Sequence, residues 1–225
     1  MTPDELASRI DHTLLKPEAV FGDYTQLVRD AIKNKFFSVC VPSFYVNLAK
    51  HQVHQSGVKV CSVIGFPFGN SSIESKIEEA RQAIKDGADE LDIVVNIGAV
   101  KSHDFKRVRD ELIQVRKVTM GKILKVILET GLLDINDMSS SCNICIETEV
   151  DFVKTSTGVN VKLPPSTTSE HVARLKQFVQ DTPVQVKASG GIKTLADVRL
   201  MLDAGADRIG TSSGVNILEE LRGEK

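Results

Sequence analysis

Short apolar runs rich in β-branched residues recur along the chain at regular intervals. Seven clear runs cover residues 36–41, 58–64, 90–95, 123–128, 150–154, 184–187 and 207–210, and a weaker one covers residues 9–15. Between them lie stretches with apolar residues at helical spacing, such as Ile73, Ile77, Ala80 and Ile84. The runs are apolar on both faces, as strands covered by helices are. Eight such strands alternating with helices predict parallel pairing through right-handed crossovers.

An internal repeat supports this arrangement. Gly87-Ala-Asp and Gly205-Ala-Asp recur where a helical stretch gives way to a strand, and Glu149-Val-Asp is a looser copy. Both glycines fit the left-handed position just past a helix end. Eight units of about 28 residues would fill the chain, which is near the size of one strand–helix unit. The predicted fold class is therefore a (β/α)8 TIM barrel, a single domain over residues 1–225. The rival fold, an open doubly wound sheet, lacks its GxGxxG turn here.

Composition and charge exclude several classes of protein. With 41% hydrophobic and 26% charged residues, the chain of 225 residues is typical of a globular protein. A net charge of -2, 5% aromatic residues and no Trp argue against nucleic acid or an acidic membrane surface as partners. No run approaches about 18 apolar residues and the start lacks a signal-peptide pattern, so we expect a cytoplasmic protein. The four cysteines include the CxxC pair Cys142 and Cys145, which we interpret as small residues on one helical face.

Four ionisable residues interrupt the apolar strand runs. They are Asp92, Lys125, Lys154 and Lys187, on the fourth to seventh predicted strands, which are neighbours in a barrel. Neighbouring strands lie about 4.8 Å apart, so side chains pointing inward from these strands could converge. A salt-bridged polar layer, or lysines that reach past the barrel rim, would be a purely structural explanation. Titrating groups gathered at a barrel mouth are also what covalent amine chemistry needs.

That chemistry requires an uncharged amine. A free lysine has a pKa of about 10.4, and partial burial or a second ammonium group nearby favours the uncharged form. Two lysines on adjacent strands supply both influences, and a carboxylate within reach can move protons directly or through water. The pattern indicates a lyase that forms a Schiff base, and by itself leaves open which lysine is the nucleophile.

Glycine- and serine-rich turns follow the last three predicted strands. They contain Gly158 after the sixth strand, Gly190 and Gly191 after the seventh, and Gly210, Ser212 and Ser213 after the eighth. In many barrels the loops after the last two strands and a helix N-terminus hold a phosphate, because backbone N–H groups and hydroxyls can approach it there. We therefore predict a small phosphorylated carbonyl compound as the substrate.

Ordered motifs along most of the chain closely resemble the deoxyribose-phosphate aldolase family. The motifs are DHTLLKP at residues 11–17, VIGFP at 63–67, DGADELDIVVNIG at 86–98, LKVILET at 124–130, DFVKTSTG at 151–158 and KASGGIKT at 187–194. The resemblance implies a class I aldolase with a (β/α)8 fold and with no metal or cofactor. Such an enzyme reversibly cleaves the small phosphorylated sugar 2-deoxy-D-ribose 5-phosphate into D-glyceraldehyde 3-phosphate and acetaldehyde.

The resemblance also implies roles for individual residues. Lys154 would form the Schiff base, Lys187 would be the neighbouring lysine that favours its uncharged form, and Asp92 would move protons with Lys187 and a water. Lys125 would support this charged group. The other matches are Gly158, Gly190, Gly191, Ser212 and Ser213 at the phosphate turns, and Asp11, Thr13 and Cys40 as residues that support the pocket.

The chain departs from the family pattern in two places. Residues 159–165 follow Gly158 where many members have an aromatic residue and more glycines, and residues 221–225 contain no tyrosine, whereas some members use a C-terminal tyrosine in proton transfer. Two alternatives remain open: another phosphate-binding barrel enzyme, such as a sugar-phosphate isomerase or a different Schiff-base aldolase, and a non-catalytic sugar-phosphate-binding protein. We expect a homo-oligomer, a dimer or a tetramer.

Overall fold

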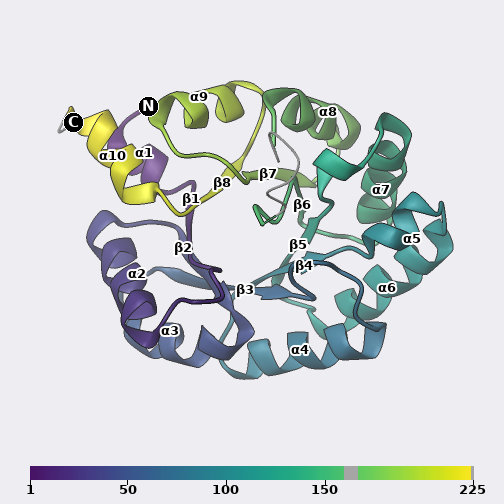
Figure 1. Cartoon of the computed structure of the whole chain (residues 1–225), viewed down its shortest axis with the longest axis horizontal. Helices are drawn as coiled ribbons and strands as arrows, with labels where there is room; N and C mark the ends of the chain where they lie inside the picture. The colour runs from purple at the N-terminus through teal and green to yellow at the C-terminus, as the bar shows by residue number, and fades with distance from the viewer. Residues whose placement is uncertain (160–166, 224–225) are drawn as a thin grey trace.

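Eight parallel strands form a closed barrel, in which each strand pairs with the next and β8 pairs with β1 (Figure 1). The computed structural model describes residues 1–159 and 167–223. The strands are β1 (Ile10–Thr13), β2 (Ser38–Pro42), β3 (Lys59–Ile64), β4 (Glu90–Val94), β5 (Ile123–Ile127), β6 (Phe152–Lys154), β7 (Gln185–Ser189) and β8 (Arg208–Thr211). The predicted (β/α)8 fold is therefore confirmed, and every predicted strand end lies within two residues of the observed one.

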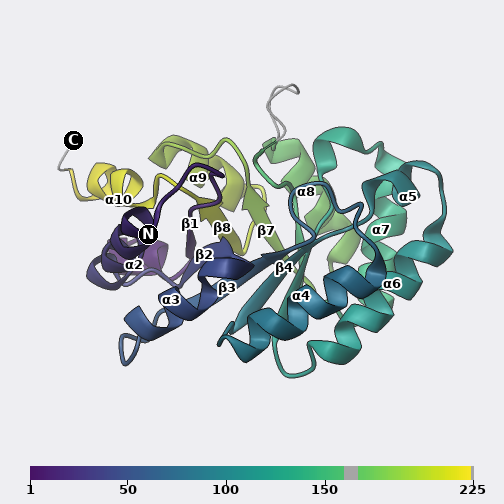
Figure 2. The same cartoon turned by 60° about the horizontal axis from the view of Figure 1, so that its bottom comes forward.

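Helices surround the barrel, and the N-terminus and α1 lie on the same side of it as α10 (Figures 1 and 2). The α-helices are α1 (Pro3–Ala7), α2 (Phe21–Asn34), α3 (Val46–Gln52), α4 (Ile73–Lys85), α5 (Ile97–Lys101), α6 (Phe105–Val118), α7 (Ile135–Glu147), α8 (Ser169–Val179), α9 (Leu195–Asp203) and α10 (Gly214–Arg222). Short 3-10 helices cover Ser43–Tyr45 and Thr130–Leu132. Within the described ranges, no helix combines the length and the apolar character needed to cross a lipid bilayer.

Polar side chains define where many helices begin. The residue before the helix accepts a backbone N–H of the first turn at Thr2, Ser72, Asn96, Asp104, Asp134, Thr168 and Thr194. Each such bond satisfies a donor that has no partner inside the helix, and is typically worth about 1 kcal/mol. The helix boundaries are thus encoded locally, next to the loops that carry the site.

Three of the strands are each preceded by an aspartate, and the three aspartates make equivalent contacts around the barrel. Asp89 accepts the backbone N–H of Val60 at 2.9 Å and pairs with Lys50 of α3 at 2.8 Å. Asp151 and Asp207 likewise bond to the preceding strand and to a cation on the helix before that strand. The sequence repeat therefore fastens the start of one strand to its neighbouring helix.

The glycines of the repeat have the backbone conformation that the sequence predicts. Gly87 has φ of +106° and Gly205 has φ of +102°. A Cβ atom built on them would lie 2.6 Å from Cγ of Lys50 and 2.8 Å from Cγ of Lys176. These are the lysines that pair with the neighbouring aspartates, so the glycines make room for the same ion pairs.

The apolar core lies between the strands and the helices rather than inside the barrel. Outward-facing residues such as Leu91, Ile93 and Val126 are fully buried in it. Inside the barrel, a small separate cluster contains Cys40, Cys61 and Val63, with Leu15 and Phe66 packed against it. The expectation that the strands are apolar on both faces is wrong for the inner face, because charged side chains from β4 to β8 take the inward positions there.

Candidate active site

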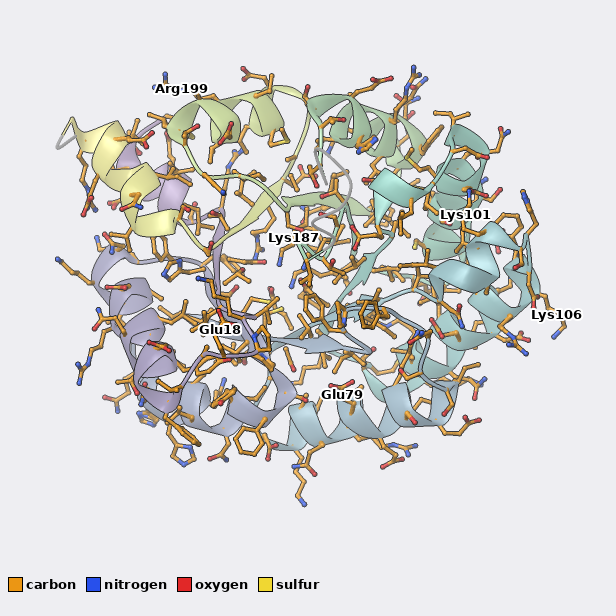
Figure 3. The ribbon with its side chains drawn as sticks, viewed as in Figure 1. Glu18, Glu79, Lys101, Lys106, Lys187 and Arg199 are labelled. Carbon is orange, nitrogen blue, oxygen red and sulfur yellow. The ribbon has the colours of Figure 1, made fainter. Side chains whose placement is uncertain are left out.

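Alternation along the strands brings a set of charged side chains into the barrel. Residues two apart on a strand face the same side of the sheet, so Glu90 and Asp92 on β4 share the inner face. The strand register pairs Asp92 with Lys125, and Lys154 with Lys187. Figure 3 shows Lys187 inside the barrel, whereas surface charges such as Lys106 and Arg199 project from the outer helices.

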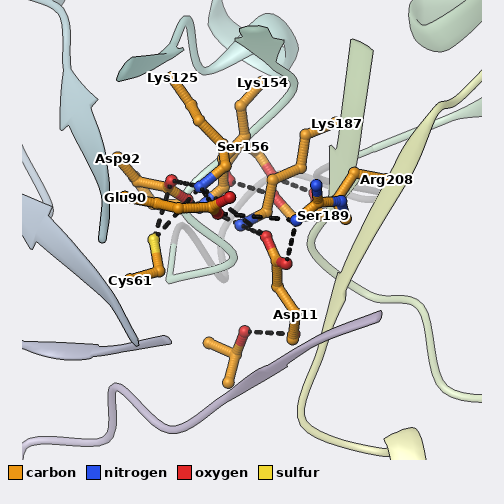
Figure 4. A network of polar contacts seen from close by, with 12 residues as sticks. Asp11, Cys61, Glu90, Asp92, Lys125, Lys154, Ser156, Lys187, Ser189 and Arg208 are labelled. Carbon is orange, nitrogen blue, oxygen red and sulfur yellow. Dashed lines mark hydrogen bonds and ion pairs between the residues drawn. The ribbon is translucent and has the colours of Figure 1, made fainter. Parts of the chain in front are cut away.

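Asp92 is the centre of this group. Its Oδ2 lies 2.8 Å from Nζ of Lys154 and 2.8 Å from Nζ of Lys187, and its Oδ1 lies 2.7 Å from Nζ of Lys125 (Figure 4). Asp92, Lys125 and Lys187 are fully buried and Lys154 is 2% exposed. The structure therefore brings together the four residues singled out by charge, and these three lysines do not reach past the rim.

Asp11 on β1 extends the group across the barrel. Its Oδ2 lies 2.5 Å from Nζ of Lys187, and its Oδ1 accepts a hydrogen bond from Arg208 at 2.9 Å. Glu90 Oε2 lies 2.6 Å from Nζ of Lys125. The Asp11–Lys187 and Glu90–Lys125 contacts are close ion pairs between fully or almost fully buried groups.

The ion pairs decide the charge state of most of these groups. Burial raises the pKa of Asp92, but the ammonium groups of Lys125, Lys154 and Lys187 outweigh it and hold that pKa well below its usual range. Burial lowers the pKa of Lys187, but the carboxylates of Asp11 and Asp92 raise it above its ordinary value.

Lys125 follows the same rule, with burial outweighed mainly by Asp92, so its pKa is raised well above its usual range. Asp92 is thus an anion, and Lys125 and Lys187 are cations. Lys154 differs from both, because Asp92 is its only carboxylate partner among the described residues.

Cys40, Cys61 and Asp92 form a cluster of atoms of metal-ligating types. Cys40 and Cys61 are register partners on β2 and β3, and the sulfur and carboxylate atoms all lie within 4.8 Å of one another. Three ammonium groups contact the same carboxylate and would repel a cation. These three residues therefore fit a metal poorly. Cys61 instead helps to position Asp92, because it donates a hydrogen bond to Asp92 Oδ1 at 3.1 Å. The expectation that no metal or cofactor takes part stays a prediction.

Hydroxyl groups hold the turns after β6 and β7 against each other. Ser156 Oγ donates to the carbonyl of Ser189 at 2.6 Å, and Ser189 Oγ donates to the carbonyl of Ser156 at 2.6 Å. Thr155 Oγ1 accepts the backbone N–H of Ser189 at 2.9 Å. A Cβ atom built on Gly158 would therefore lie only 3.4 Å from Cα of Gly190. Two of the turns expected to hold a phosphate therefore contact each other. In the sequence they closely follow Lys154 and Lys187.

The other residues assigned to the phosphate site lie in different surroundings. Gly191 has φ of +78° in the turn after β7. Ser212 is exposed, and Ser213 precedes α10 without making a side-chain cap bond. Gly210 faces the barrel interior, where a Cβ atom would lie 3.0 Å from Cε of Lys187. Because Gly210 has no side chain, it leaves space for the Lys187 side chain.

Thr13, expected to support the pocket, donates from Oγ1 to the carbonyl of Asp11 at 2.9 Å and pairs in register with Cys40. Together with His12, Lys16 and Ser212 it lines a cavity of about 500 Å³ beside the β8–α10 turn. The sequence departures at residues 160–165 and at residues 224–225 lie outside the described residues. Cys142 and Cys145 are buried on α7, where burial raises the pKa of Cys142 to about 12, so the CxxC pair has a packing role.

Three residues at or near this site were not predicted from the sequence, two in the charged network and one beside the turn after β6. Glu90 and Arg208 carry the same signal as Asp92, an ionisable residue in an apolar strand, but each is the first residue of its strand. Glu129 is buried after β5 with φ of +57°, and its Oε2 accepts hydrogen bonds from Thr157 Oγ1 at 2.6 Å and from Thr157 N–H at 3.3 Å. No periodicity in the sequence indicates that contact.

A (β/α)8 barrel with three lysines on one internal carboxylate, below turns rich in backbone donors, has the features of a lysine Schiff-base lyase. The family model described as DeoC/LacD family aldolase matches residues 6–220. The deoxyribose-phosphate aldolase of Finegoldia magna is 46% identical over 215 residues, which are 96% of this chain and 99% of that protein. That of Mannheimia succiniciproducens is 44% identical over 222 residues, 99% of this chain and 97% of that protein.

The fold agrees with these relatives. The tetrameric deoxyribose phosphate aldolase from Aeropyrum pernix superimposes with a TM-score of 0.91 at 38% identity, covering 100% of this chain and 94% of that chain. The chain belongs to the DeoC/LacD family of aldolases. The resemblance indicated by the motifs is therefore confirmed at the level of the family.

Proposed function

We propose that this protein is a class I aldolase that reversibly cleaves 2-deoxy-D-ribose 5-phosphate into D-glyceraldehyde 3-phosphate and acetaldehyde through a Schiff base on Lys154. The observation that carries the proposal is the contact of Lys154 and Lys187 with one oxygen of Asp92 inside the barrel of an aldolase family member. Lys154 is the nucleophile because it is the least paired and the most exposed of the three lysines.

The reaction begins when the uncharged amine of Lys154 attacks the C1 aldehyde of the open-chain sugar. Loss of water gives an iminium ion, which can accept an electron pair. A base removes the proton of the C3 hydroxyl, the C2–C3 bond breaks, and its electron pair moves into the iminium to form an enamine. Carbons 3 to 5 leave as glyceraldehyde 3-phosphate, since C3 becomes the new aldehyde. Protonation of the enamine at C2 and addition of water then release acetaldehyde and restore the amine.

Asp92 and Lys187 carry the protons in this scheme. Asp92 is an anion that contacts both lysines, and Lys187 is held in its charged form by Asp11 and Asp92, with the pKa of Lys187 above its ordinary value because these carboxylates outweigh burial. A water between this pair and the substrate would exchange protons with the C3 hydroxyl and with C2. Lys125 keeps Asp92 in place by binding its other oxygen.

The phosphate group of the substrate binds at the turns after β6, β7 and β8. Backbone N–H groups of Gly158, Gly190 and Gly191 and the hydroxyls of Ser212 and Ser213 are the donors, together with the N-terminus of α10. With the phosphate bound there, the C1 aldehyde at the other end of the sugar would extend toward Lys154. The arrangement supports a preference for a phosphorylated substrate.

Reduction with borohydride in the presence of acetaldehyde tests the proposal. We expect an ethyl group on Lys154, detected by peptide mass spectrometry, together with acetaldehyde release from 2-deoxy-D-ribose 5-phosphate. Lys154→Met should abolish both, whereas the exposed-surface control Lys106→Met should change neither. Substantial cleavage by Lys154→Met, or an adduct on another lysine, would refute the assignment.

The same assays separate the alternatives. A different Schiff-base aldolase would form the adduct but prefer another member of a panel of sugar phosphates. An isomerase or a sugar-phosphate-binding protein would release no acetaldehyde and trap no adduct. A buried group of three lysines on one carboxylate is costly to maintain without chemistry, which favours the aldolase.

We also propose a cytoplasmic homo-oligomer, a dimer or a tetramer. Soluble oligomers are most often symmetric homo-oligomers, and the relative from Aeropyrum pernix is a tetramer. The four free cysteines, two of them neighbours inside the barrel, suit a reducing compartment. Sedimentation equilibrium of the purified protein and cell fractionation test these two points.

A further inference from the structure

The ion-pair network inside the barrel contains more cations than carboxylates. Among the described residues, four cationic side chains face three carboxylates: Lys125, Lys154, Lys187 and Arg208 against Asp11, Glu90 and Asp92. With every group ionised, the network has one surplus positive charge. A buried charge without a counter-charge is costly, so the loss of one proton from this network is favoured.

Lys154 gives up a proton with the smallest loss of pairing. An arginine keeps its proton at any ordinary pH. Lys125 lies within 2.7 Å of both Asp92 and Glu90, and Lys187 lies within 2.8 Å of both Asp11 and Asp92. Lys154 has one carboxylate contact, which it shares with Lys187. Without the proton of Lys154, the network has three cations and three carboxylates.

Glu90 and Arg208 form the end of the network that is remote from Lys154. Arg208 Nη1 lies 3.6 Å from Glu90 Oε2, and the guanidinium group stacks on the ring of Phe37 at 3.5 Å from its centroid. Each residue is the first of its strand, two positions before Asp92 and Gly210, so each faces the barrel interior together with the residue two positions further on. Neither residue forms an ion pair or a hydrogen bond with Lys154.

We propose that Glu90 and Arg208 are positioning residues that set the protonation of Lys154 at a distance, by fixing the surplus charge of the buried network. This inference rests on the proposed function only in naming Lys154 as the reacting amine. The charged and titratable groups around that amine inside the barrel are Asp11, Cys40, Cys61, Glu90, Asp92, Lys125, Lys187 and Arg208. Because the interior is buried, removing one charge there acts on all the others.

The test follows the labelling of Lys154 by acetic anhydride as a function of pH, read by peptide mass spectrometry, with the exposed Lys106 as reference. Arg208→Gln removes the surplus, so the midpoint of Lys154 labelling should rise by about one pH unit. Glu90→Gln enlarges the surplus, so the midpoint should fall by about as much. The double variant Glu90→Gln/Arg208→Gln restores the original balance, and its midpoint should return close to that of the unmodified protein.

Charge-conserving variants separate this effect from damage to the structure. Arg208→Lys and Glu90→Asp should leave the midpoint unchanged, and thermal unfolding checks that each variant folds. If Arg208→Gln does not fold, Glu90→Gln compared with Glu90→Asp decides alone. Shifts of the same sign in both single variants, no shift, or a double variant that does not return would overturn the proposal.

A further variant, Cys40→Ala, tests whether a thiol supplies the missing negative charge instead. The interaction with the Cys61 side chain, together with the charges of Lys187 and Lys154, lowers the pKa of Cys40, so a thiolate there is the competing explanation. We expect no change in the Lys154 midpoint, and a fall as large as that of Glu90→Gln would overturn the proposal. Opposite shifts in the two single variants without any acetaldehyde adduct would leave this inference standing and refute the aldolase function alone.

Discussion

Lys154 and Lys187 are register partners on neighbouring parallel strands, and both of their Nζ atoms lie 2.8 Å from the same oxygen of Asp92. Two ammonium groups at one oxygen repel each other, and nearby carboxylates offset this repulsion more for one lysine than for the other. Lys187 has a second carboxylate, Asp11, at 2.5 Å, whereas Lys154 has none among the described residues. Lys187 is therefore paired with two carboxylates and Lys154 with one, which is the difference on which the proposed roles of the two lysines depend.

Replacing Asp92 by Asn should affect both catalysis and stability. The amide cannot take up protons, so we expect the cleavage rate to fall about 10²–10⁴-fold. It also leaves buried lysines without their common counter-charge, which should lower the free energy of unfolding by about 3 kcal/mol or more. Steady-state kinetics and urea unfolding measure the two effects. Asp89→Asn is the matched control: its carboxylate pairs with the partly exposed Lys50, so it should reduce stability and leave the rate intact.

Removing the Glu129 carboxylate should weaken binding of the phosphate. Glu129 holds the hydroxyl and the N–H of Thr157, the residue before Gly158. Glu129→Ala leaves these donors without a partner, so the turn loses its fixed conformation. We expect KM for 2-deoxy-D-ribose 5-phosphate to rise about tenfold, the equivalent of one buried hydrogen bond. Activity on unphosphorylated 2-deoxy-D-ribose, assayed in parallel, should change little.

Glu129→Gln is the conservative variant for this experiment. Its amide oxygen can still accept from Thr157, so KM should lie between those of the unmodified protein and Glu129→Ala. An equal loss of activity on both sugars would contradict a role of Glu129 in phosphate binding.

The barrel and the centre of the site were predictable from sequence because each depends on a local signal. A charge in a short apolar strand, as at Asp92 or Lys125, is costly unless it is paired, so it stands out. Glu90 and Arg208 were missed because the first residue of a strand can equally face solvent. Glu129 was missed because its contact depends on a positive φ in the turn after β5, which only the folded backbone reveals. The polar interior as a whole follows from strand register, a long-range property.

The glycine of the Gly-Ala-Asp repeat should matter for stability for two separable reasons. Gly121 and Gly205 both have positive φ, but a Cβ atom meets nothing within 4 Å at Gly121 and lies 2.8 Å from Lys176 at Gly205. Gly121→Ala should therefore cost only the backbone strain, about 1 kcal/mol. Gly205→Ala should cost clearly more, because it also displaces the lysine that pairs with Asp207. Urea unfolding of both variants measures the difference, and equal losses would contradict the assigned role of the ion pair.

His12 should make the fold less stable in mild acid. It is 5% exposed on β1, and burial, only partly opposed by Asp30 and a backbone hydrogen bond with Thr211, lowers its pKa to about 4. The unfolded chain takes up a proton near pH 6.5, whereas the folded protein does so only near pH 4, so stability is lost as the pH falls between these values. From pH 7 to pH 5 we expect a loss on the order of 2 kcal/mol from this residue. His12→Gln should remove that part of the pH dependence in urea unfolding, while the exposed control His54→Gln should retain it. An identical pH dependence in the two variants would mean that His12 is already charged in the folded protein at pH 5.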